Sequence, residues 1–353
     1  MTIKTLRNMN RSRFIIHSAG EYLNRISRAQ NTLPRPSALP TTRRLWQKFH
    51  YYALDVLRDV NDNIRENDNT PEGNAAVLVR IFSLVNAELY TLGPSWRAHI
   101  IGFLAFVKMR SSFAAALEAR LAVTANMWVM INAVLVNTTS PSDDQIMPMY
   151  EFSLEEIGTL YSHQLYGELP CPTALFLNMH RISGLRMRLA AGESVSKIQL
   201  LAQNVVDSVE RFDTGSWTEP YTVPDRPEFP VLAQAYKAAV LLYAIMTLPP
   251  CVSAVTGELY CKASIRDKLM RHIRRAMPIL DAKLALHWCL PVAGVALADG
   301  PIEDREYIEY IFDLKQGIEF YFPFYIKDTL KRFWASGSTF WDDCWIEPFP
   351  PLC

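Results

Sequence analysis

Residues 284–298 of this chain have the sequence LALHWCLPVAGVALA, which is apolar on every side of a helix. A surface helix has one apolar face and one charged face. A helix that is apolar all round is instead typical of the buried core of a globular protein. The run is 15 residues long, which is shorter than a membrane-spanning helix of roughly 20 residues. A second apolar run, 238–255, contains Pro249 and Pro250 and also predicts a buried helix. We therefore expect a helical core and no membrane partner.

Helical spacing of apolar residues extends outward from these two runs over nearly the whole chain. No stretch alternates apolar and polar residues between turn signals, and no repeat of fixed period occurs. The fold class expected is all-α, a multi-helix domain of packed helix pairs around one extended core. The expected helices span 12–30, 74–91, 110–136, 153–166, 173–190, 195–212, 230–248, 259–275, 279–298, 302–317 and 322–335. A further helix is expected after a cap at Thr41 or Thr42, with its apolar face over 45–64, and another begins near Pro94.

Large aromatic residues are expected to fill this core, because each can bury roughly 150–250 Å². The segment 213–230, which holds four prolines, predicts an extended loop pinned by its aromatic side chains. The aromatic, proline-rich tail 341–353 is expected to pack against the helices. The aromatic residues expected in the core are Trp96, Phe103, Phe176, Tyr236, Tyr243, Trp288, Trp334 and Trp341.

The charge of the chain is balanced overall but not along its length. The 353 residues contain 36 Lys and Arg and 36 Asp and Glu, so the formal charge is zero. Residues 1–44 nevertheless hold nine basic residues and one acid, Glu21, which makes this segment +8 and the remainder −8. We divide the chain into a basic arm with a proline-rich linker, 1–44, and a helical domain, 45–353. The arm is compatible with an exposed helix, a mitochondrial-type presequence or a segment that contacts phosphates.

Signatures of catalysis or metal binding are absent from the sequence. The six cysteines are widely spaced without a CxxC pair, and the seven histidines show no metal-ligand spacing. No glycine-rich phosphate loop and no G-x-S-x-G elbow occurs. We therefore expect reduced thiols, no catalytic residues, no metal and no cofactor.

One further basic segment lies in the C-terminal half. Between residues 262 and 275, seven basic or histidine side chains accompany a single acid, Asp267. This segment could form a phosphate-binding face, or a solvated helix face that pairs with the acidic surface of the chain itself. The absence of interleaved aromatic residues argues against base stacking there.

Several of these segments occur in the order found in a known protein family. The chain resembles the fungal-specific transcription factor domain of zinc-cluster regulators, over roughly residues 75–348. The pattern W-x-x-H-x-x-G is matched at 96–102, and A-x-L-L-Y at 239–243. The pattern L-x-W-P-x-x-x-A-G is matched at 286–294, except that Cys289 replaces the proline and Pro291 lies two residues later. The remaining similarities are residues 175–182, Arg305, Trp334 and the tryptophans of 341–345.

The resemblance implies a nuclear protein that controls transcription, in this family often of metabolic or secondary-metabolite gene clusters. The six-cysteine zinc cluster of the family is not matched, because the first cysteine here is Cys171. The function expected is therefore a transcriptional regulator or regulator-like protein without its own zinc-cluster DNA-binding motif. Expected partners are DNA, reached indirectly or through a partner regulator, and a second copy or related chain as a dimer.

Two sets of residues are candidates for binding. Polar groups on otherwise apolar helices suggest a pocket for a small apolar effector, and basic residues of the arm suggest phosphate contacts. The pocket candidates are Trp96, His99, Tyr243 and His287. The phosphate candidates are Arg7, Arg11 and Arg13.

The alternative function is an all-α biosynthetic enzyme, such as a terpene-cyclase-like protein. Such an enzyme needs D-D-x-x-D and a second acidic motif to hold Mg²⁺ and diphosphate. The pairs Asp342-Asp343 and Asp143-Asp144 both lack the third acid at the required offset. The sequence therefore favours a regulator over an enzyme.

Overall fold

The computed structural model describes the chain from the end of the proline-rich linker to the C-terminal tail, with gaps. The expected helix 12–30 and the candidates Arg7, Arg11 and Arg13 lie outside the described residues. The described residues are 40–66, 70–91, 95–110, 120–162, 169–218, 228–279, 285–315 and 322–350.

The protein is all-α, as the sequence predicts. In the described residues, α-helices are joined by turns and two 3-10 helices, and the β-structure consists of one isolated bridge between Val252 and Leu259. The helices of the N-terminal half are α2 (Pro40–Glu66), α3 (Pro71–Thr91), α4 (Trp96–Arg110), α6 (Arg120–Thr138), η2 (Met147–Glu151), α7 (Leu154–Ser162), α8 (Thr173–Ala190) and α9 (Val195–Arg211). Those of the C-terminal half are α10 (Thr214–Thr218), α11 (Glu228–Thr247), α12 (Lys262–Ala276), α14 (Cys289–Ala296), η4 (Leu297–Asp299), α15 (Ile302–Lys315), α16 (Phe322–Ser336) and α17 (Trp341–Cys344).

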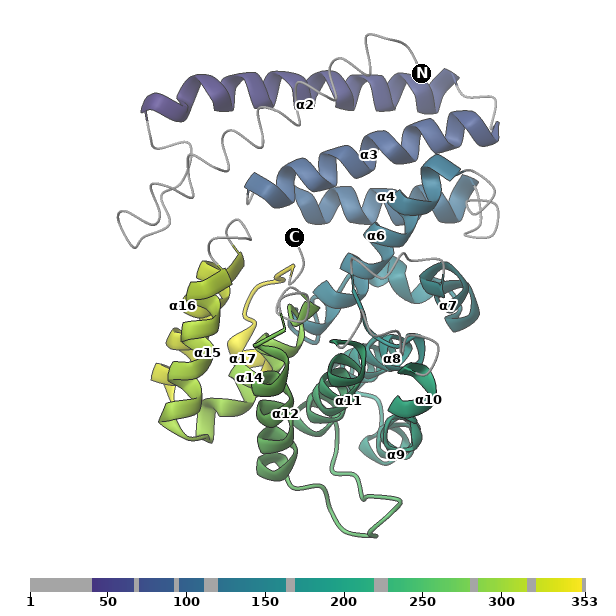
Figure 1. Ribbon diagram of the computed structural model, residues 1–353. Coiled ribbons are helices and arrows are strands. Elements are labelled where there is room, and N and C mark those ends of the chain that lie inside the picture. The colour runs from purple at the N-terminus through teal and green to yellow at the C-terminus, as the bar shows by residue number, and fades with distance from the viewer. Residues whose placement is uncertain are drawn as a thin grey trace.

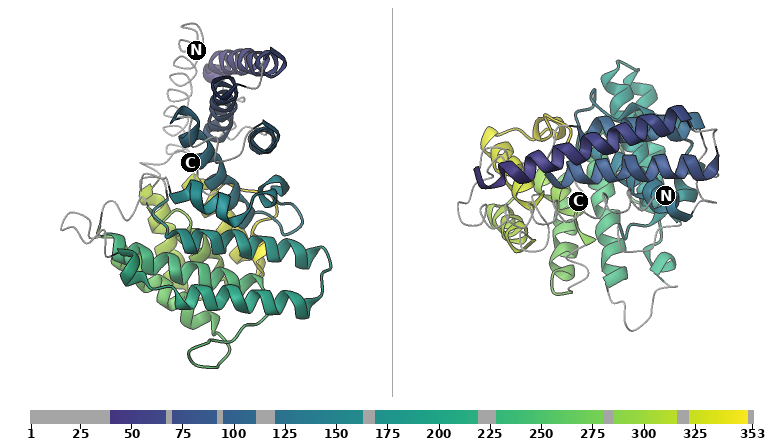
Figure 2. Two further views of the ribbon diagram at one scale, coloured as in Figure 1. Left: turned by 90° about the vertical axis from the view of Figure 1, so that its right-hand side faces the viewer. Right: turned by 90° about the horizontal axis from the view of Figure 1, so that it is seen from above.

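Consecutive helices pack as pairs. Helix α3 packs against α4, α8 against α9, α11 against α12, and α15 against α16. Figure 1 shows the long α2 lying across α3 at one end of the molecule, with α8, α9, α11 and α12 at the other end. The view from the side in Figure 2 shows that α6 connects these two parts, and α6 packs on both α3 and α8. The arrangement confirms packed helix pairs around one extended core.

Helix α11 lies at the centre of the larger part. It contacts α8, α9, α10, α12 and α14, because small and branched apolar residues let neighbouring helices approach from several sides. Among the described helices, α11 alone has the length and apolar composition needed to cross a membrane, yet 67% of that stretch is buried inside the protein. Burial on this scale is typical of a central helix in a globular core.

The eight aromatic residues expected in the core all belong to one contiguous apolar cluster. Six of them are buried, and Trp96 and Trp334 are partly buried against the cluster surface. Ring contacts connect them, including Tyr236 stacked on Trp288 with ring centres 6.5 Å apart. The expected aromatic core is therefore confirmed.

Two expected elements differ from the structure. Part of the loop predicted over 213–230 forms the short helix α10, because Asp213 accepts hydrogen bonds from the backbone N–H groups of Gly215 and Ser216 at its start. The helix predicted over 279–298 is interrupted in its described part, because Ala285 is helical, 286–288 form a turn, and α14 begins at Cys289. Residues 280–284 lie outside the described residues. Pro291 then falls in the first turn of α14, where its missing N–H leaves no hydrogen bond unmade.

The C-terminal tail packs back on the end of α6, as predicted for its described part, 341–350. Thr139 and Phe349 form a reciprocal pair, in which the Phe349 N–H donates to the Thr139 carbonyl at 3.1 Å and the Thr139 hydroxyl donates to the Phe349 carbonyl. The rings of Trp341, Trp345 and Phe349 follow one another along this segment, and all three are buried. The tail therefore completes the core.

Candidate functional site

A buried arginine, Arg186 on α8, organises the polar interior of the core. Its guanidinium donates to the Tyr243 hydroxyl at 2.7 Å and forms an ion pair with Asp342. Only 2% of the Arg186 side chain is exposed, against 40% for Asp342. The same guanidinium also donates to the carbonyl oxygens of Asn137 and Thr138 at the end of α6 and of Ser140 just after it. Arg186 therefore joins α6, α8, α11 and α17 at one point.

The protonation states in this network follow from its geometry. Burial lowers the pKa of Arg186, but the facing Tyr243 and Asp342 outweigh it and raise the pKa above its ordinary value. Burial raises the pKa of Asp342, yet the Arg186 guanidinium and donors from Ser142 bring it below its ordinary value. Asp342 is therefore a carboxylate and Arg186 a cation near neutral pH, and both act as structural partners.

The tryptophans singled out by the sequence surround the same point. Trp288 donates its indole N–H to the Thr138 hydroxyl at 2.8 Å, and Trp341 donates to the Thr138 carbonyl at 2.8 Å. Tyr243 lies edge-on to Trp288, with ring centres 5.8 Å apart, and 4.8 Å from Trp341. These rings pack the core and anchor the end of α6, which is a structural role.

The residues after α14 hold that helix in place. Arg305 donates to the carbonyl oxygens of Leu297 and Ala298, at 2.8 and 2.6 Å, where a helix end needs donors. Trp334 donates its indole N–H to the Gly294 carbonyl at 2.9 Å. A Cβ on Gly294 would lie 2.4 Å from the Cδ1 of Leu330, so α14 and α16 approach too closely for a larger residue.

The four candidates for an effector pocket lie on three different elements. Trp96 and His99 lie on α4, which packs against α3, α6 and η2. Tyr243 lies on α11 and is fully buried, with its hydroxyl already bonded to Arg186 and Ser183. His287 is partly buried in the turn before α14, next to Trp288, which contacts Tyr243. A pocket formed by all four residues stays a prediction.

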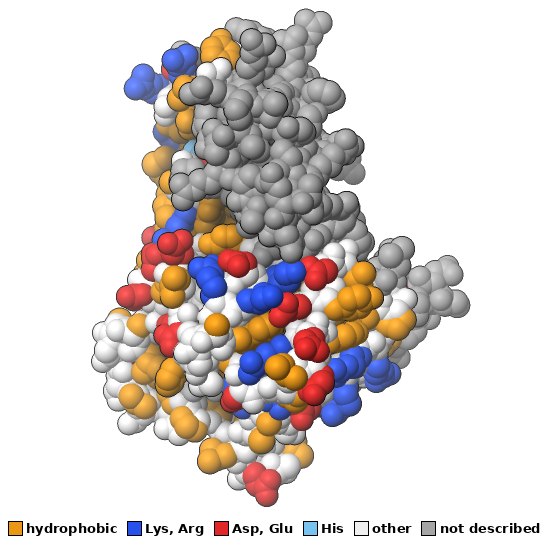
Figure 3. Space-filling view, turned by 90° about the vertical axis from the view of Figure 1, so that its left-hand side faces the viewer, with side chains coloured by type: hydrophobic (Ala, Val, Ile, Leu, Met, Phe, Trp, Pro, Cys, Tyr) orange, Lys and Arg blue, Asp and Glu red, His pale blue; other side chains and the backbone are white. Residues whose placement is uncertain are grey.

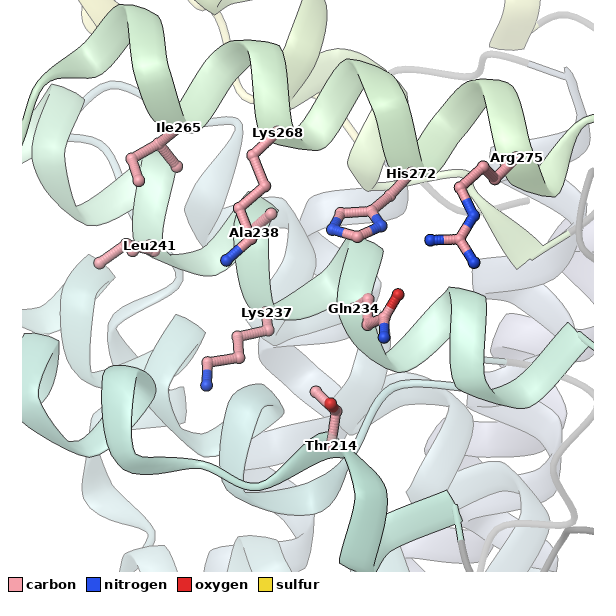
Figure 4. Close-up of a pocket in the computed structure, with 9 residues that line it drawn as sticks. All are labelled: Thr214, Gln234, Lys237, Ala238, Leu241, Ile265, Lys268, His272 and Arg275. Atoms are coloured by element: carbon pink, nitrogen blue, oxygen red, sulfur yellow. The ribbon is translucent and has the colours of Figure 1, made fainter.

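A pocket of about 320 Å³ lies elsewhere, between α10, α11 and α12. It is built by two helix faces, because residues three, four and seven apart on a helix share one side. Figure 4 shows the two faces opposite each other, with Thr214 of α10 at the edge. The face of α11 contributes Gln234, Lys237, Ala238 and Leu241. The face of α12 contributes Ile265, Lys268, His272 and Arg275.

The lining of this pocket is cationic. Three lining residues carry a positive charge (Lys237, Lys268 and Arg275), and none of the nine lining residues is acidic. Desolvation and the charges of Lys268, Arg275 and Arg271 lower the pKa of His272 to about 4, so its ring is neutral near pH 7. Both ring nitrogens of His272 are buried and have no hydrogen-bond partner in the part of the chain that the structure describes.

The basic segment 262–275 is thus divided between two faces of α12. On one face, Lys262 pairs with Asp299 at 3.0 Å and Arg274 pairs with Asp304, as expected for cations that answer the chain's own acids. Arg266, which is buried, also lies within 3.6 Å of Asp299. On the other face, Lys268 and Arg275 line the pocket and, among the described residues, form no ion pair.

The acidic pairs considered for metal binding have other partners. Asp342 pairs with Arg186, the Asp343 carboxylate accepts from the Ser338 hydroxyl, and Asp144 pairs with Arg97 at 2.6 Å. Within the described ranges, no three His, Cys, Asp or Glu side chains come close enough together to hold a metal ion. The surface over α15 and α16 mixes basic and acidic groups, as the space-filling view in Figure 3 shows.

The pocket was not found from the sequence, although a signal was present. Gln234 and Lys237 are polar residues three apart on an otherwise apolar helix, which places both on one face. From the sequence, the basic residues of α12 are expected to form a phosphate-binding face or a solvated face, but not one wall of a pocket. Pairing the two helices required the tertiary structure.

A comparison with curated proteins gives one informative similarity. The chain is similar to a phomenoic acid biosynthesis cluster-specific transcriptional regulator of Leptosphaeria maculans, with 22% identity over 324 residues. The similarity covers 88% of this chain and 61% of that protein, so the chain spans less than two thirds of its relative. No protein-family model and no solved structure matches the chain. A distant relative that regulates transcription is consistent with the fungal regulator domain suggested by the motifs.

Proposed function

We propose that this protein is a transcriptional regulator of a fungal metabolic or secondary-metabolite gene cluster and that it acts in the nucleus. The observation that carries the proposal is the similarity, along 88% of the chain, to a regulator of one biosynthesis cluster. The order of the sequence motifs supports the same assignment. This function places the chain in the class of regulatory proteins and not among the biosynthetic enzymes of such a pathway.

The motif residues form a rigid packed core, which suits a regulatory domain. Tyr243, Trp288 and Trp341 are engaged in packing and hydrogen bonding around Arg186, which makes them determinants of the fold. The acids Asp342 and Asp343 serve as partners of Arg186 and Ser338. A regulatory domain needs such a rigid core to transmit ligand or partner binding, whereas catalysis needs convergent reactive groups.

We further propose that contact with DNA is made through a partner regulator or through the basic arm, and that the protein acts as a dimer. Lys and Arg side chains in such an arm would bind phosphates without reading the base sequence. Replacing Arg7, Arg11 and Arg13 together by Gln should then weaken binding to duplex DNA and reduce its salt dependence. DNA binding that is insensitive to salt, or unchanged in this variant, would contradict phosphate binding by the arm.

Deletion of the gene in the organism that encodes it tests the proposal directly. A regulator predicts that transcripts of neighbouring genes change together, and that reintroducing the gene restores them. The enzyme alternative predicts unchanged transcripts and accumulation of one precursor. A fluorescent fusion protein should concentrate in the nucleus, and exclusion from it would contradict the nuclear assignment.

A further inference from the structure

The pocket between α10, α11 and α12 contains cations that the fold does not use. Arg266 and Arg274, on the other face of α12, have carboxylate partners. Lys268 and Arg275 line the pocket, and among the described residues neither forms an ion pair. Like charges held together repel one another, so an arrangement of this kind is stabilised when an anion enters.

Lys237 contributes a third charge from the opposite helix. Its ammonium group donates to the carbonyl oxygens of Glu210 and Phe212, both at 2.7 Å, which fixes its position and leaves one of its three donors available. Desolvation and the nearby Lys268 lower the pKa of Lys237, while Glu210 and Asp213 act in the opposite sense. Both carboxylates are engaged elsewhere, Glu210 by Ser253 and Asp213 at the start of α10.

Neutral hydrogen-bonding groups complete the polar side of the pocket. His272 lies between Lys268 and Arg275 along α12, and Gln234 lies opposite it on α11 (Figure 4). Neither ring nitrogen of His272 has a hydrogen-bond partner among the described residues, and buried polar groups without partners are rare in folded proteins. Protein atoms cover both nitrogens, so a ligand oxygen would reach either of them only after a small side-chain movement.

The rest of the lining is apolar. Ala238 and Leu241 of α11 face Ile265 of α12, next to the basic residues. A strongly hydrated inorganic ion would gain nothing from these side chains. A molecule with an apolar portion would bury it against them, and a volume of about 320 Å³ suits a small organic compound.

We propose that this pocket binds a small organic anion, with a carboxylate or phosphate head group held by Lys237, Lys268 and Arg275 and an apolar portion resting on Leu241 and Ile265. Arg275 offers a planar pair of donors suited to either head group. Bound in this way, the molecule links α11 to α12, and α12 packs on α14. The role of the ligand as an effector of transcription rests on the proposed function. Binding of the ligand to the pocket does not.

Calorimetric titration of the purified full chain tests the proposal, with octanoate, octyl phosphate and uncharged octanamide as probes. Octanoate or octyl phosphate should bind with a Kd below about 1 mM, and the tighter of the two identifies the head group. Octanamide should bind much more weakly. Equal binding of octanamide, or failure of both anions to bind, would overturn the proposal.

Two matched variants locate the binding site. Arg275→Gln should weaken anion binding at least about tenfold, the effect of losing one charge-assisted hydrogen bond. Arg271→Gln makes the same change on the same helix at an exposed residue outside the lining, so its affinity should stay within about twofold of the wild type. Equal losses in the two variants would indicate attraction to the general basic surface of α12 and would contradict a pocket. The outcome does not depend on the gene-deletion experiment, so the two proposals can fail separately.

Discussion

Arg186 and Asp342 form an ion pair across 156 residues of chain, in which the arginine is buried and the aspartate lies half-exposed at the start of α17. The pair fastens the C-terminal tail to α8, at the point where α6 ends and Tyr243 of α11 approaches. A charge in this position is tolerated because carbonyl, hydroxyl and carboxylate oxygens surround it. One cation and its acceptors therefore connect α6, α8, α11 and α17.

Asp342→Asn should destabilise the protein by about 1.5–3 kcal/mol, because a charge-assisted hydrogen bond to a buried guanidinium is weakened. The remaining acceptors of Arg186 and the partial exposure of Asp342 keep the loss below that of a fully buried pair. Chemical denaturation measures the change. Asp343→Asn, at the neighbouring exposed residue, is the control and should change stability by less than about 0.5 kcal/mol.

The same ion pair predicts a dependence on pH. The pKa of Asp342 is lower in the folded protein than in the unfolded chain. The ion pair therefore stabilises the fold at any pH above the ordinary pKa of a carboxyl group. That contribution is lost as the pH falls through the lowered pKa. The difference in stability between wild type and Asp342→Asn should therefore shrink below about pH 4. A difference that grows on acidification would contradict the assignment.

Tyr243→Phe isolates the hydroxyl that joins Arg186 to Ser183. The substitution keeps the ring against Trp288 but leaves the two polar groups without this partner, which should cost about 1–3 kcal/mol. Thermal unfolding followed by circular dichroism measures it. Tyr310→Phe, on the exposed part of α15, should be neutral within about 0.5 kcal/mol. Equal effects would show that the buried hydroxyl contributes nothing specific.

Two buried tryptophans allow one hydrogen bond to be measured by difference. Trp288 donates to Thr138, whereas the indole N–H of the equally buried Trp345 has no partner among the described residues. Phe in place of either residue removes a similar apolar area. Trp288→Phe should therefore cost about 1 kcal/mol more than Trp345→Phe, as measured by urea unfolding. The reverse order would contradict this account of the core.

The two motif glycines should respond oppositely to alanine. A Cβ at Gly294 would lie within 3.2 Å of three atoms of the buried Leu330, so Gly294→Ala should destabilise by about 1–3 kcal/mol. A Cβ at Gly102, in the exposed middle of α4, would meet no described residue within 4 Å, and Gly102→Ala should stabilise by about 0.5–1 kcal/mol. Melting temperatures that move in the same direction for both variants would refute the packing argument.

Thiol reactivity tests the burial of the cysteines. Cys261 is exposed, whereas Cys171, Cys251, Cys289 and Cys344 are buried, and burial raises the pKa of Cys251 to about 11. In a Cys353→Ser background, a thiol reagent should modify Cys261 rapidly and the other four only on unfolding. Cys261→Ser should abolish the rapid phase. A second fast thiol would show that part of the core opens readily.

The sequence was sufficient to predict the helices but not all of their limits. The helix predicted over 173–190 coincides with α8, because its apolar spacing is regular between Pro172 and Gly192. The start of α14 and the helix α10 were missed, since both depend on local hydrogen bonds and turns that periodicity does not reveal. The expected aromatic core was found because large rings have few alternatives to burial.

Binding residues were much harder to predict. The sequence predicts binding at His99, Tyr243 and His287 because they are polar groups on apolar segments, yet the hydroxyl of Tyr243 is bonded within the core. Lys237 and Arg275 line one pocket although they lie on different helices. Nothing in the local sequence of either helix specifies the other as its neighbour.

By itself, the sequence determined the all-α class, the membership of the aromatic core and the similarity to a transcriptional regulator. These properties follow from side-chain period and apolar content, which each segment carries independently of the others. The tertiary structure alone decided that Asp342 neutralises Arg186, that Gly294 admits Leu330, and that Lys268 and Arg275 face α11 while Arg274 faces Asp304. The physical reason is that charge pairing and steric contact depend on distances between groups far apart in the chain, and only the packed helices fix those distances.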